Sequence, residues 1–234
     1  MTGPAAVVVG ASGGIGRAVA DALEAGSRYD SVIRLSRSGD SPVPIDVTCE
    51  DSISHAAKWL ADSQITPSLL FVATGLLHQA DRGPEKSLRQ LDADWLIENY
   101  RVNAIGPALV AKYFLPLMAR KETIRFAALS ARVGSISDNR LGGWHGYRAS
   151  KAALNMMIRN LSIEWSRKNE KSIIVALHPG TVDTALSVPF QGNVPPGKLL
   201  DSGRAAGQLL TVLDALEPAD SGKFFAWDGR EIEP

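Results

Sequence analysis

The chain has 234 residues, and its 25 lysines and arginines balance its 25 aspartates and glutamates. Apolar residues make up 45% of it, which is enough for a sizeable core and excludes a disordered chain. The balanced charge argues against a nucleic-acid partner, because proteins that bind phosphate backbones usually carry a basic excess. No apolar run approaches the roughly 18 residues of a membrane span, and no basic region of a signal peptide precedes the first apolar run. We therefore expect a cytoplasmic protein that acts on a small molecule.

Cysteine and histidine are too sparse for a disulfide or a metal site. Cys49 is the single cysteine, so it has no partner within the chain. The four histidines are scattered and show no zinc-binding spacing. These counts favour a reducing compartment and predict no bound metal.

Short apolar segments alternate with segments of helical pattern along the whole chain. Strands are expected at 5–9, 31–35, 68–73, 124–129, 172–177 and 223–227, and helices near 14–25, 52–63, 92–119, 147–169 and 203–215. Nearly continuous apolar strands are typical of a parallel sheet covered on both faces. We predict one domain over residues 1–234, an α/β Rossmann-type doubly wound parallel sheet flanked by helices. The Pro- and Gly-rich segment 187–198 is interpreted as either a mobile lid or a surface loop.

A glycine-rich turn follows the first expected strand and leads into a helix. Glycines there permit a tight turn, a close approach of the backbone to a pyrophosphate, and close packing of helix on strand. The N-terminus of the helix would face the phosphates with its unpaired N–H groups. The turn therefore predicts a dinucleotide site that contains Gly10, Ser12, Gly13, Gly14, Ile15 and Gly16.

The same residues also match the G-x-S-x-G elbow of α/β-hydrolases, with Ser12 as the nucleophile. Asp138 with His145 or His178 would complete the order Ser, Asp, His. An elbow on the first strand, however, leaves no earlier loop to supply an oxyanion-hole N–H, so we favour the dinucleotide site. A P-loop is excluded because no lysine followed by serine or threonine closes the segment.

The end of the second expected strand distinguishes between NAD and NADP. An acidic residue there would bind the ribose 2′-hydroxyl of NAD. The strand ends instead in Ser36 and Arg37, and a guanidinium binds a 2′-phosphate through two parallel charge-assisted hydrogen bonds. We expect NADP(H) to be preferred, with NAD(H) as the alternative.

Tyr147 and Lys151 are four residues apart at the start of an expected helix, and therefore lie on one face. A free phenol has a pKa of about 10, which is too high for a base at neutral pH. A neighbouring ammonium stabilises the phenolate and lowers that pKa. The pair is thus expected to act as a general acid and base.

With these features in this order, the whole chain resembles the short-chain dehydrogenase/reductase family of NAD(P)-dependent Rossmann-fold oxidoreductases. Tyr147 and Lys151 match its catalytic pair, and Asn103 matches the asparagine that supports a proton-relay water. Segments 134–139 and 146–156 resemble the subgroup of sniffer-type carbonyl reductases and C-factor. The resemblance also implies cofactor contacts at Asp46, Val47, Ala73, Thr74, Gly75, Pro179, Gly180, Val182 and Thr184.

The chain departs from the family at its third catalytic group, a serine that hydrogen-bonds the substrate oxygen. Ala131 stands at that position and has no hydroxyl. Ser130 would take the role through a one-residue shift, and Ser135 would reach in from the following loop. In the third alternative Tyr147 polarises the carbonyl alone. We expect Ser130 to fill the role.

The resemblance implies an NADP(H)-dependent oxidoreductase that interconverts a carbonyl and an alcohol on a small molecule. Its catalytic residues would be Asn103, Ser130, Tyr147 and Lys151. The helical surfaces at 92–119 and 147–169 resemble those through which the family forms homodimers or homotetramers. The contrasting hypothesis, motivated by Ala131, is a dinucleotide-binding signalling or sensor protein with little turnover.

Overall fold

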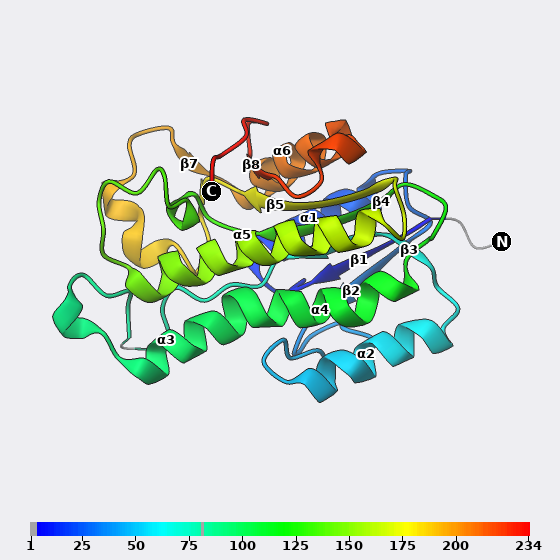
Figure 1. Ribbon diagram of the computed structural model, residues 1–234, viewed down its shortest axis with the longest axis horizontal. Helices are drawn as coiled ribbons and strands as arrows, with labels where there is room; N and C mark the ends of the chain where they lie inside the picture. The colour runs from blue at the N-terminus through cyan, green and yellow to red at the C-terminus, as the bar shows by residue number, and fades with distance from the viewer. Residues whose placement is uncertain (1–3, 81) are drawn as a thin grey trace.

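A computed structural model describes residues 4–80 and 82–234 as one α/β domain built on a six-stranded sheet (Figure 1). Every neighbouring pair of strands is parallel, and the order along the sheet is β2-β1-β3-β4-β5-β8. The order reverses between β1 and β3, so the predicted doubly wound sheet is confirmed. The strands are β1 (Ala5–Val9), β2 (Ser31–Leu35), β3 (Pro67–Val72), β4 (Ile124–Leu129), β5 (Ser172–His178) and β8 (Phe224–Ala226).

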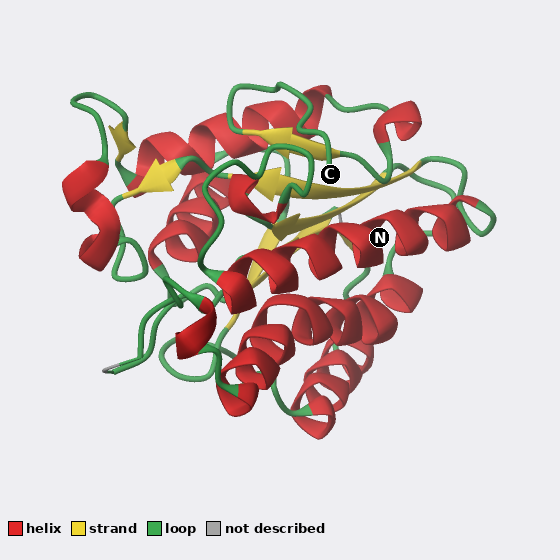
Figure 2. Ribbon diagram, turned by 60° about the vertical axis from the view of Figure 1, so that its left-hand side comes forward, coloured by secondary structure: helices red, strands yellow, loops and turns green. Residues whose placement is uncertain are grey.

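Helices cover both faces of the sheet (Figures 1 and 2). The first face carries α1 (Gly14–Ala25) and α6 (Ser202–Ala215). The other carries α2 (Glu50–Asp62), α4 (Gly106–Phe114) and α5 (His145–Ser166), and α3 (Ala93–Tyr100) packs against α5. None of the helices within the described ranges is long and apolar enough to cross a membrane.

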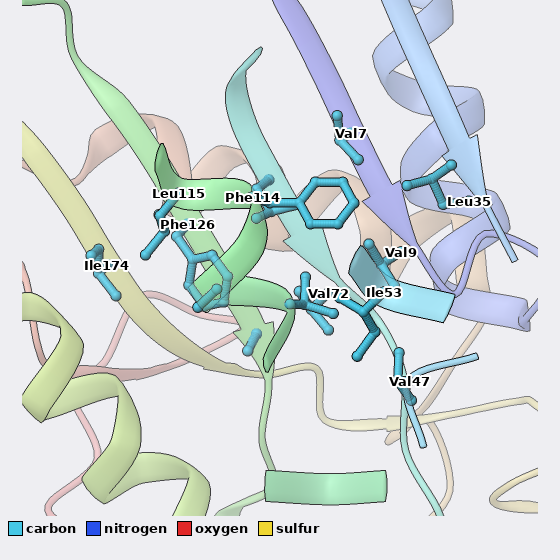
Figure 3. Packing of buried hydrophobic residues seen from close by; sticks show 14 of the residues in the cluster. Val7, Val9, Leu35, Val47, Ile53, Val72, Phe114, Leu115, Phe126 and Ile174 are labelled. Carbon is cyan, nitrogen blue, oxygen red and sulfur yellow. The ribbon is translucent and has the colours of Figure 1, made fainter. Parts of the chain in front are cut away.

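The central strands are largely apolar because both of their faces are buried. In β1, Val7 and Val9 contribute to the core under α2, α4 and α5, whereas Ala6 and Val8 contribute to the core under α1 and α6. Phe114 at the end of α4 lies over the strands and fills the first of these cores, as Figure 3 shows. This burial on both faces leaves mainly the ends of the central strands free to carry polar groups.

The helix expected over 92–119 is broken in the middle. Residues Arg101–Ile105 form a π-helical turn between α3 and α4, and a 3-10 turn (Leu115–Leu117) follows α4. Single π turns are often found at functional sites, and this one contains Asn103, whose buried side chain bonds to the backbone of Leu76. The apolar pattern alone did not indicate the break.

The Pro- and Gly-rich segment after β5 is partly ordered by pairing. Two short strands that the sequence did not suggest, β6 (Thr181–Val182) and β7 (Leu199–Leu200), pair in parallel. Between them, Val188–Asn193 forms a 3-10 helix. Its Phe190 contacts His78 and Trp144, so the segment covers neighbouring residues of the domain.

Substitution of Gly16 tests the close packing of α1 on the turn after β1. A Cβ at this position would lie 2.2 Å from the carbonyl oxygen of Gly10. Gly16→Ala must therefore move backbone, and we expect the free energy of unfolding to fall by about 1–3 kcal/mol or more. Chemical denaturation measures this change.

Gly207→Ala in α6 is the matched control, because a Cβ there meets nothing within 4 Å. It should stabilise the protein by up to about 1 kcal/mol, since alanine is the better helix former. Equal stability of the two variants would contradict the proposed packing of α1.

Candidate active site

A cavity of about 420 Å³ opens at the carboxyl ends of β1, β2 and β3. This is the edge of the sheet at which the strand order reverses, the usual ligand position in doubly wound folds. Sequence reasoning missed Glu98 and Val102, which also line the cavity. Ten predicted cofactor residues line it: Gly10, Ser12, Gly13, Ser36, Arg37, Asp46, Val47, Ala73, Thr74 and Gly75.

The remaining predicted cofactor residues lie beside the first turn of α1. A Cβ on Gly14 would lie 2.7 Å from Cγ2 of Thr184, so the segment after β5 touches the helix N-terminus. Ile15 packs against the apolar cluster that contains Val182. Gly180 has a φ of +78°, which favours glycine. The structure thus brings Gly14, Ile15, Gly16, Pro179, Gly180, Val182 and Thr184 to the same end of the sheet as the glycine turn.

Arg37 lies exposed at the edge of the cavity, and its guanidinium forms no ion pair within the described part of the chain. The neighbouring Ser36 is buried, and its hydroxyl donates to the carbonyl of Ser38. The carboxylate of Asp46 accepts hydrogen bonds from the amide and the hydroxyl of Thr48, and these bonds lower its pKa. The cavity therefore offers one unpaired cation close to an ordered carboxylate.

The residues of the cavity fit a dinucleotide phosphate. The glycine turn leaves backbone N–H groups accessible at the N-terminus of α1. No acidic residue occupies the first turn of α1. The hydroxyl of Thr74 is buried at the cavity and has no hydrogen-bond partner among the described residues. An anion with additional hydrogen-bonding groups would satisfy these positions.

Tyr147 and Lys151 are both buried on the first turns of α5, 8% and 2% exposed. The ammonium of Lys151 lies 5.8 Å from the centre of the Tyr147 ring and donates a 2.7 Å hydrogen bond to the carbonyl oxygen of Leu129, at the end of β4. The two side chains therefore lie close together, as the sequence predicted. The bond to Leu129 fixes the ammonium to the sheet.

Burial shifts the pKa values of the two groups in opposite directions. It raises the pKa of Tyr147 above the ordinary value of 10.0 and lowers the pKa of Lys151 to about 7. Both shifts arise because a low-dielectric site disfavours the charged form. The expectation that Lys151 lowers the pKa of Tyr147 is therefore not met in the protein alone: the phenol keeps its proton at neutral pH.

Asn103 belongs to a buried polar network at the π turn. Its amide bonds to both backbone groups of Leu76, each at 2.8 Å, and donates to the hydroxyl of Ser150 at 3.1 Å. Ser150 in turn donates to the carbonyl oxygen of Tyr147. A Cβ added to Gly75 would lie 3.7 Å from both Oδ1 of Asn103 and Nζ of Lys151, so these polar atoms converge on one point.

Neither candidate serine hydroxyl hydrogen-bonds to Tyr147. The hydroxyl of Ser130 is buried and donates to Oδ1 of Asn155 at 2.7 Å. The hydroxyl of Ser135 accepts from the amide of Asp138 and lies 3.3 Å from the hydroxyl of Ser137. Ala131, by contrast, belongs to an apolar cluster with Tyr147. These contacts favour the alternative without a serine hydroxyl.

The structure does not assemble a Ser–Asp–His triad. Ser12 lines the dinucleotide cavity, and the carboxylate of Asp138 is paired with Arg132 at 2.6 Å. Burial and the charge of Arg132 lower the pKa of His178 to about 4. The hydrolase interpretation is therefore not supported.

Sequence reasoning missed Glu85, which holds the N-terminus of α5. Its buried carboxylate accepts from the amide of Gly146 at 3.1 Å, and its backbone carbonyl accepts from the amide of Trp144. A carboxylate at a helix N-terminus complements the helix dipole. Glu85 lies far from Tyr147 in the chain and in a loop without periodicity, so no sequence signal indicated the contact.

Removal of the Lys151 ammonium should change how stability depends on pH. Between about pH 7 and pH 10, the unfolded chain keeps a proton on Lys151 that the folded chain lacks. This difference makes the free energy of unfolding rise with pH, by up to about 1.4 kcal/mol per unit. Lys151→Met should remove that contribution to the slope, as denaturation at several pH values would show.

Lys198→Met provides the control, because it removes a lysine ammonium from an exposed position. In this variant the free energy of unfolding should change with pH as steeply as in the unchanged protein. A Lys151→Met variant with the same slope as the control would show that Lys151 is not desolvated.

Residues 4–193 match the family model described as short chain dehydrogenase. A 1-hydroxy-2-glutathionyl-2-methyl-3-butene dehydrogenase of Rhodococcus sp. (strain AD45) is 30% identical, over 97% of this chain and 98% of its own length. The C-signal protein of Myxococcus xanthus is 36% identical, over 62% of this chain and 82% of its own.

Solved structures resemble the whole chain. An NADPH-bound carbonyl reductase from chicken fatty liver superposes with a TM-score of 0.84 at 27% identity, covering all of both chains. A short-chain dehydrogenase/reductase from Burkholderia multivorans with bound NADP gives a TM-score of 0.81 at 25% identity, covering 99% of each chain. Carbonyl reductase Sniffer of D. melanogaster, 21% identical with a TM-score of 0.84 over all of both chains, shares the fold. The chain belongs to the short-chain dehydrogenase family of oxidoreductases.

Proposed function

We propose that this oxidoreductase uses NADP(H) to interconvert a carbonyl and an alcohol on a small molecule. The observation that carries the proposal is the buried Tyr147–Lys151 pair, which lies on α5 next to a cavity suited to a dinucleotide. The relatives support the same chemistry, since they include a dehydrogenase and an NADPH-bound carbonyl reductase. NADPH, when bound, supplies a hydride to the carbonyl carbon.

The cofactor would be held by the glycine turn, by Arg37 and by the segment after β5. Arg37 is the cation available to a 2′-phosphate, and β2 carries no carboxylate at its end. The two relatives described as bound to NADPH or NADP support the preference for the phosphorylated dinucleotide over NAD(H). The predicted contacts of Gly10, Gly13 and Asp46 belong to this proposal.

Tyr147 would donate a proton to the substrate oxygen during reduction. Its raised pKa keeps the phenol protonated at neutral pH, as a general acid requires. Lys151 lies close enough to stabilise the phenolate that remains. Asn103 holds the loop after β3 in place. Its Oδ1 and the Nζ of Lys151 both lie near Gly75, and Asn103 would complete, through a water, the relay that replaces the proton on Tyr147.

A signalling or sensor protein with little turnover is the second candidate. Ala131 lacks the hydroxyl that would donate a hydrogen bond to the substrate oxygen, and in other enzymes the loss of such a donor lowers the rate by about 10²–10³. The C-signal protein is also among the relatives. In this candidate the cavity still binds a dinucleotide, but the protein reduces little or no carbonyl substrate. Turnover measurements distinguish the two.

We also propose that the protein is a cytoplasmic homodimer or homotetramer. Apolar side chains are exposed along α3, the π turn and α5, which are the predicted contact surfaces. They include Ile97, Ile105, Met157 and Ile163. Cys49 is an exposed free thiol, as suits a reducing compartment.

Tyr147→Phe should lower kcat for reduction of a carbonyl by NADPH by about 10²–10⁴, because it removes the proton donor. The measurement is NADPH oxidation with a panel of aldehydes and ketones. Unchanged turnover would contradict the mechanism. Tight NADPH binding without turnover of any carbonyl would favour the sensor.

Ser130→Ala and Ser135→Ala serve as controls. If kcat changes little in both variants, Tyr147 works without a serine hydroxyl. If kcat falls by about 10² or more in one of them, that serine binds the substrate oxygen.

Arg37→Asp should move the preference from NADPH toward NADH. Loss of the charge-assisted bonds and the added negative charge should lower the ratio of kcat/KM for NADPH to that for NADH by about 10- to 100-fold. Arg120→Asp makes the same change of charge at an exposed position before β4, at the opposite end of the sheet. An equal effect of both variants would remove Arg37 from the site.

A further inference from the structure

Tyr147 belongs to an apolar cluster to which three other segments contribute side chains. Leu77 comes from the loop after β3, Ala131 from the end of β4, and Phe190 from the 3-10 helix between β6 and β7. We call this cluster the aromatic wall. Its members are Leu77, Ala131, Tyr147, Val133, Trp144, Leu186 and Phe190.

Aromatic contacts connect the wall from end to end. The ring centroids of Trp144 and Phe190 lie 5.1 Å apart, and the two ring planes make an angle of 60°. The ring centroids of Trp144 and Tyr147 lie 6.3 Å apart, with an angle of 70° between the planes. His78 meets Phe190 at 5.9 Å, and its Nε2 lies 3.1 Å from the carbonyl oxygen of Ala185. His78 also lines the dinucleotide cavity, so its contact with Phe190 places the aromatic wall beside that cavity. A planar ring beside Tyr147 would meet aromatic partners in a favoured edge-to-face geometry.

The backbone at Trp144 is strained to put this ring in place. Gly142, Gly143 and Trp144 all have positive φ, at +62°, +64° and +51°. For a tryptophan, a left-handed backbone costs on the order of 1 kcal/mol or more. Arg148 donates to the carbonyl oxygen of Gly143 at 3.1 Å, and Glu85 accepts from the amide of Trp144. Strain that its surroundings hold in place is typical of functional positions.

Ala131 makes the wall apolar where a substrate oxygen approaches Tyr147. The hydroxyls of Ser130 and Ser135 are engaged elsewhere, so the substrate gains no serine bond from this side. Its orientation must then depend on contact with the aromatic and aliphatic side chains of the wall. A carboxylate placed against such a surface loses hydration without a compensating partner.

We infer that the substrate is an uncharged carbonyl compound with an aromatic ring next to the carbonyl, and that Trp144 and Phe190 determine this specificity. The inference rests on the proposed function, because it assigns the substrate class of the same site. It goes beyond that function by naming two recognition residues outside the Tyr147–Lys151 pair.

The test compares three aldehydes: benzaldehyde, cyclohexanecarboxaldehyde and 4-carboxybenzaldehyde. Values of kcat/KM with NADPH are measured for the unchanged protein, Trp144→Leu and Phe190→Leu, which keep apolar bulk but remove a ring. The ratio of benzaldehyde to cyclohexanecarboxaldehyde should fall about 3- to 10-fold in each variant, as expected for one aromatic pair. Comparing ratios between proteins cancels the intrinsic reactivity of the aldehydes. The unchanged protein should use 4-carboxybenzaldehyde at least about 10-fold less well than benzaldehyde.

Leu141→Ala is the control, because Leu141 is 91% exposed on the loop before Trp144 and outside the wall. Its ratio should equal that of the unchanged protein. Thermal melting and NADPH binding of each variant check that the fold and the cofactor site persist. Saturation-transfer NMR of benzyl alcohol and cyclohexylmethanol, with NADP⁺ present, provides a readout that does not need turnover.

The outcomes separate the inference from the proposed function. Turnover that depends on Tyr147, with unchanged ratios in both variants, overturns the inference and leaves the function standing. Equal use of 4-carboxybenzaldehyde and benzaldehyde overturns the uncharged class. If no aldehyde is turned over, but the unchanged protein binds benzyl alcohol preferentially and both variants lose that preference, the aromatic wall is supported and the proposed function is overturned. Absent turnover without that preference overturns both.

Discussion

The active site depends on how closely α5 approaches the end of β4. A Cβ on Gly134 would lie 2.7 Å from Cβ of Lys151 and 2.9 Å from its carbonyl carbon, so only glycine lets the helix come this near. With this contact made, the ammonium of Lys151 reaches the carbonyl oxygen of Leu129. Tyr147, one turn earlier on the same helix, is thereby fixed relative to the sheet edge where the dinucleotide cavity opens.

The close contact buries both side chains, and their pKa values shift in opposite directions. A phenol becomes charged by losing a proton and an amine by gaining one, so the same low dielectric raises the pKa of Tyr147 and lowers that of Lys151. The proton therefore stays on the oxygen, where reduction of a carbonyl needs it. Lys151, with a pKa of about 7, is the member of the pair whose charge responds to small changes in its surroundings.

The doubly wound parallel sheet and the position of the glycine turn could be predicted because they follow from local patterns. Continuous apolar strands require cover on both faces, and Gly10 and Gly16 meet only where helix and strand pack closely. The alternation of β4 also puts Ser130 on the face of Phe126 and Ala128, toward Asn155 on α5. The expectation for Ser130 assumed a one-residue shift at the end of the strand and did not consider this alternation.

Other parts of the site come from tertiary contacts that no local pattern encodes. The π turn around Asn103 is held by the backbone of Leu76, which lies 27 residues away in the chain. The left-handed Trp144 depends on Glu85, from a loop between β3 and α3. The direction of the pKa shift of Tyr147 depends on total burial, which a helical period does not measure. The sequence therefore predicted that Tyr147 and Lys151 lie close together, but not the long-range contacts that orient the residues around them.

Trp144 is hard to explain by stability alone. Glycine at this position would accept the positive φ without the steric cost that tryptophan bears. The ring is only partly buried, so its packing returns less than a core tryptophan would gain. Glu85 and Arg148 are nevertheless arranged to hold this turn, and the ring lies against Tyr147. A costly residue, fixed by two neighbours beside the proton donor, is explained more simply by recognition of a substrate than by folding.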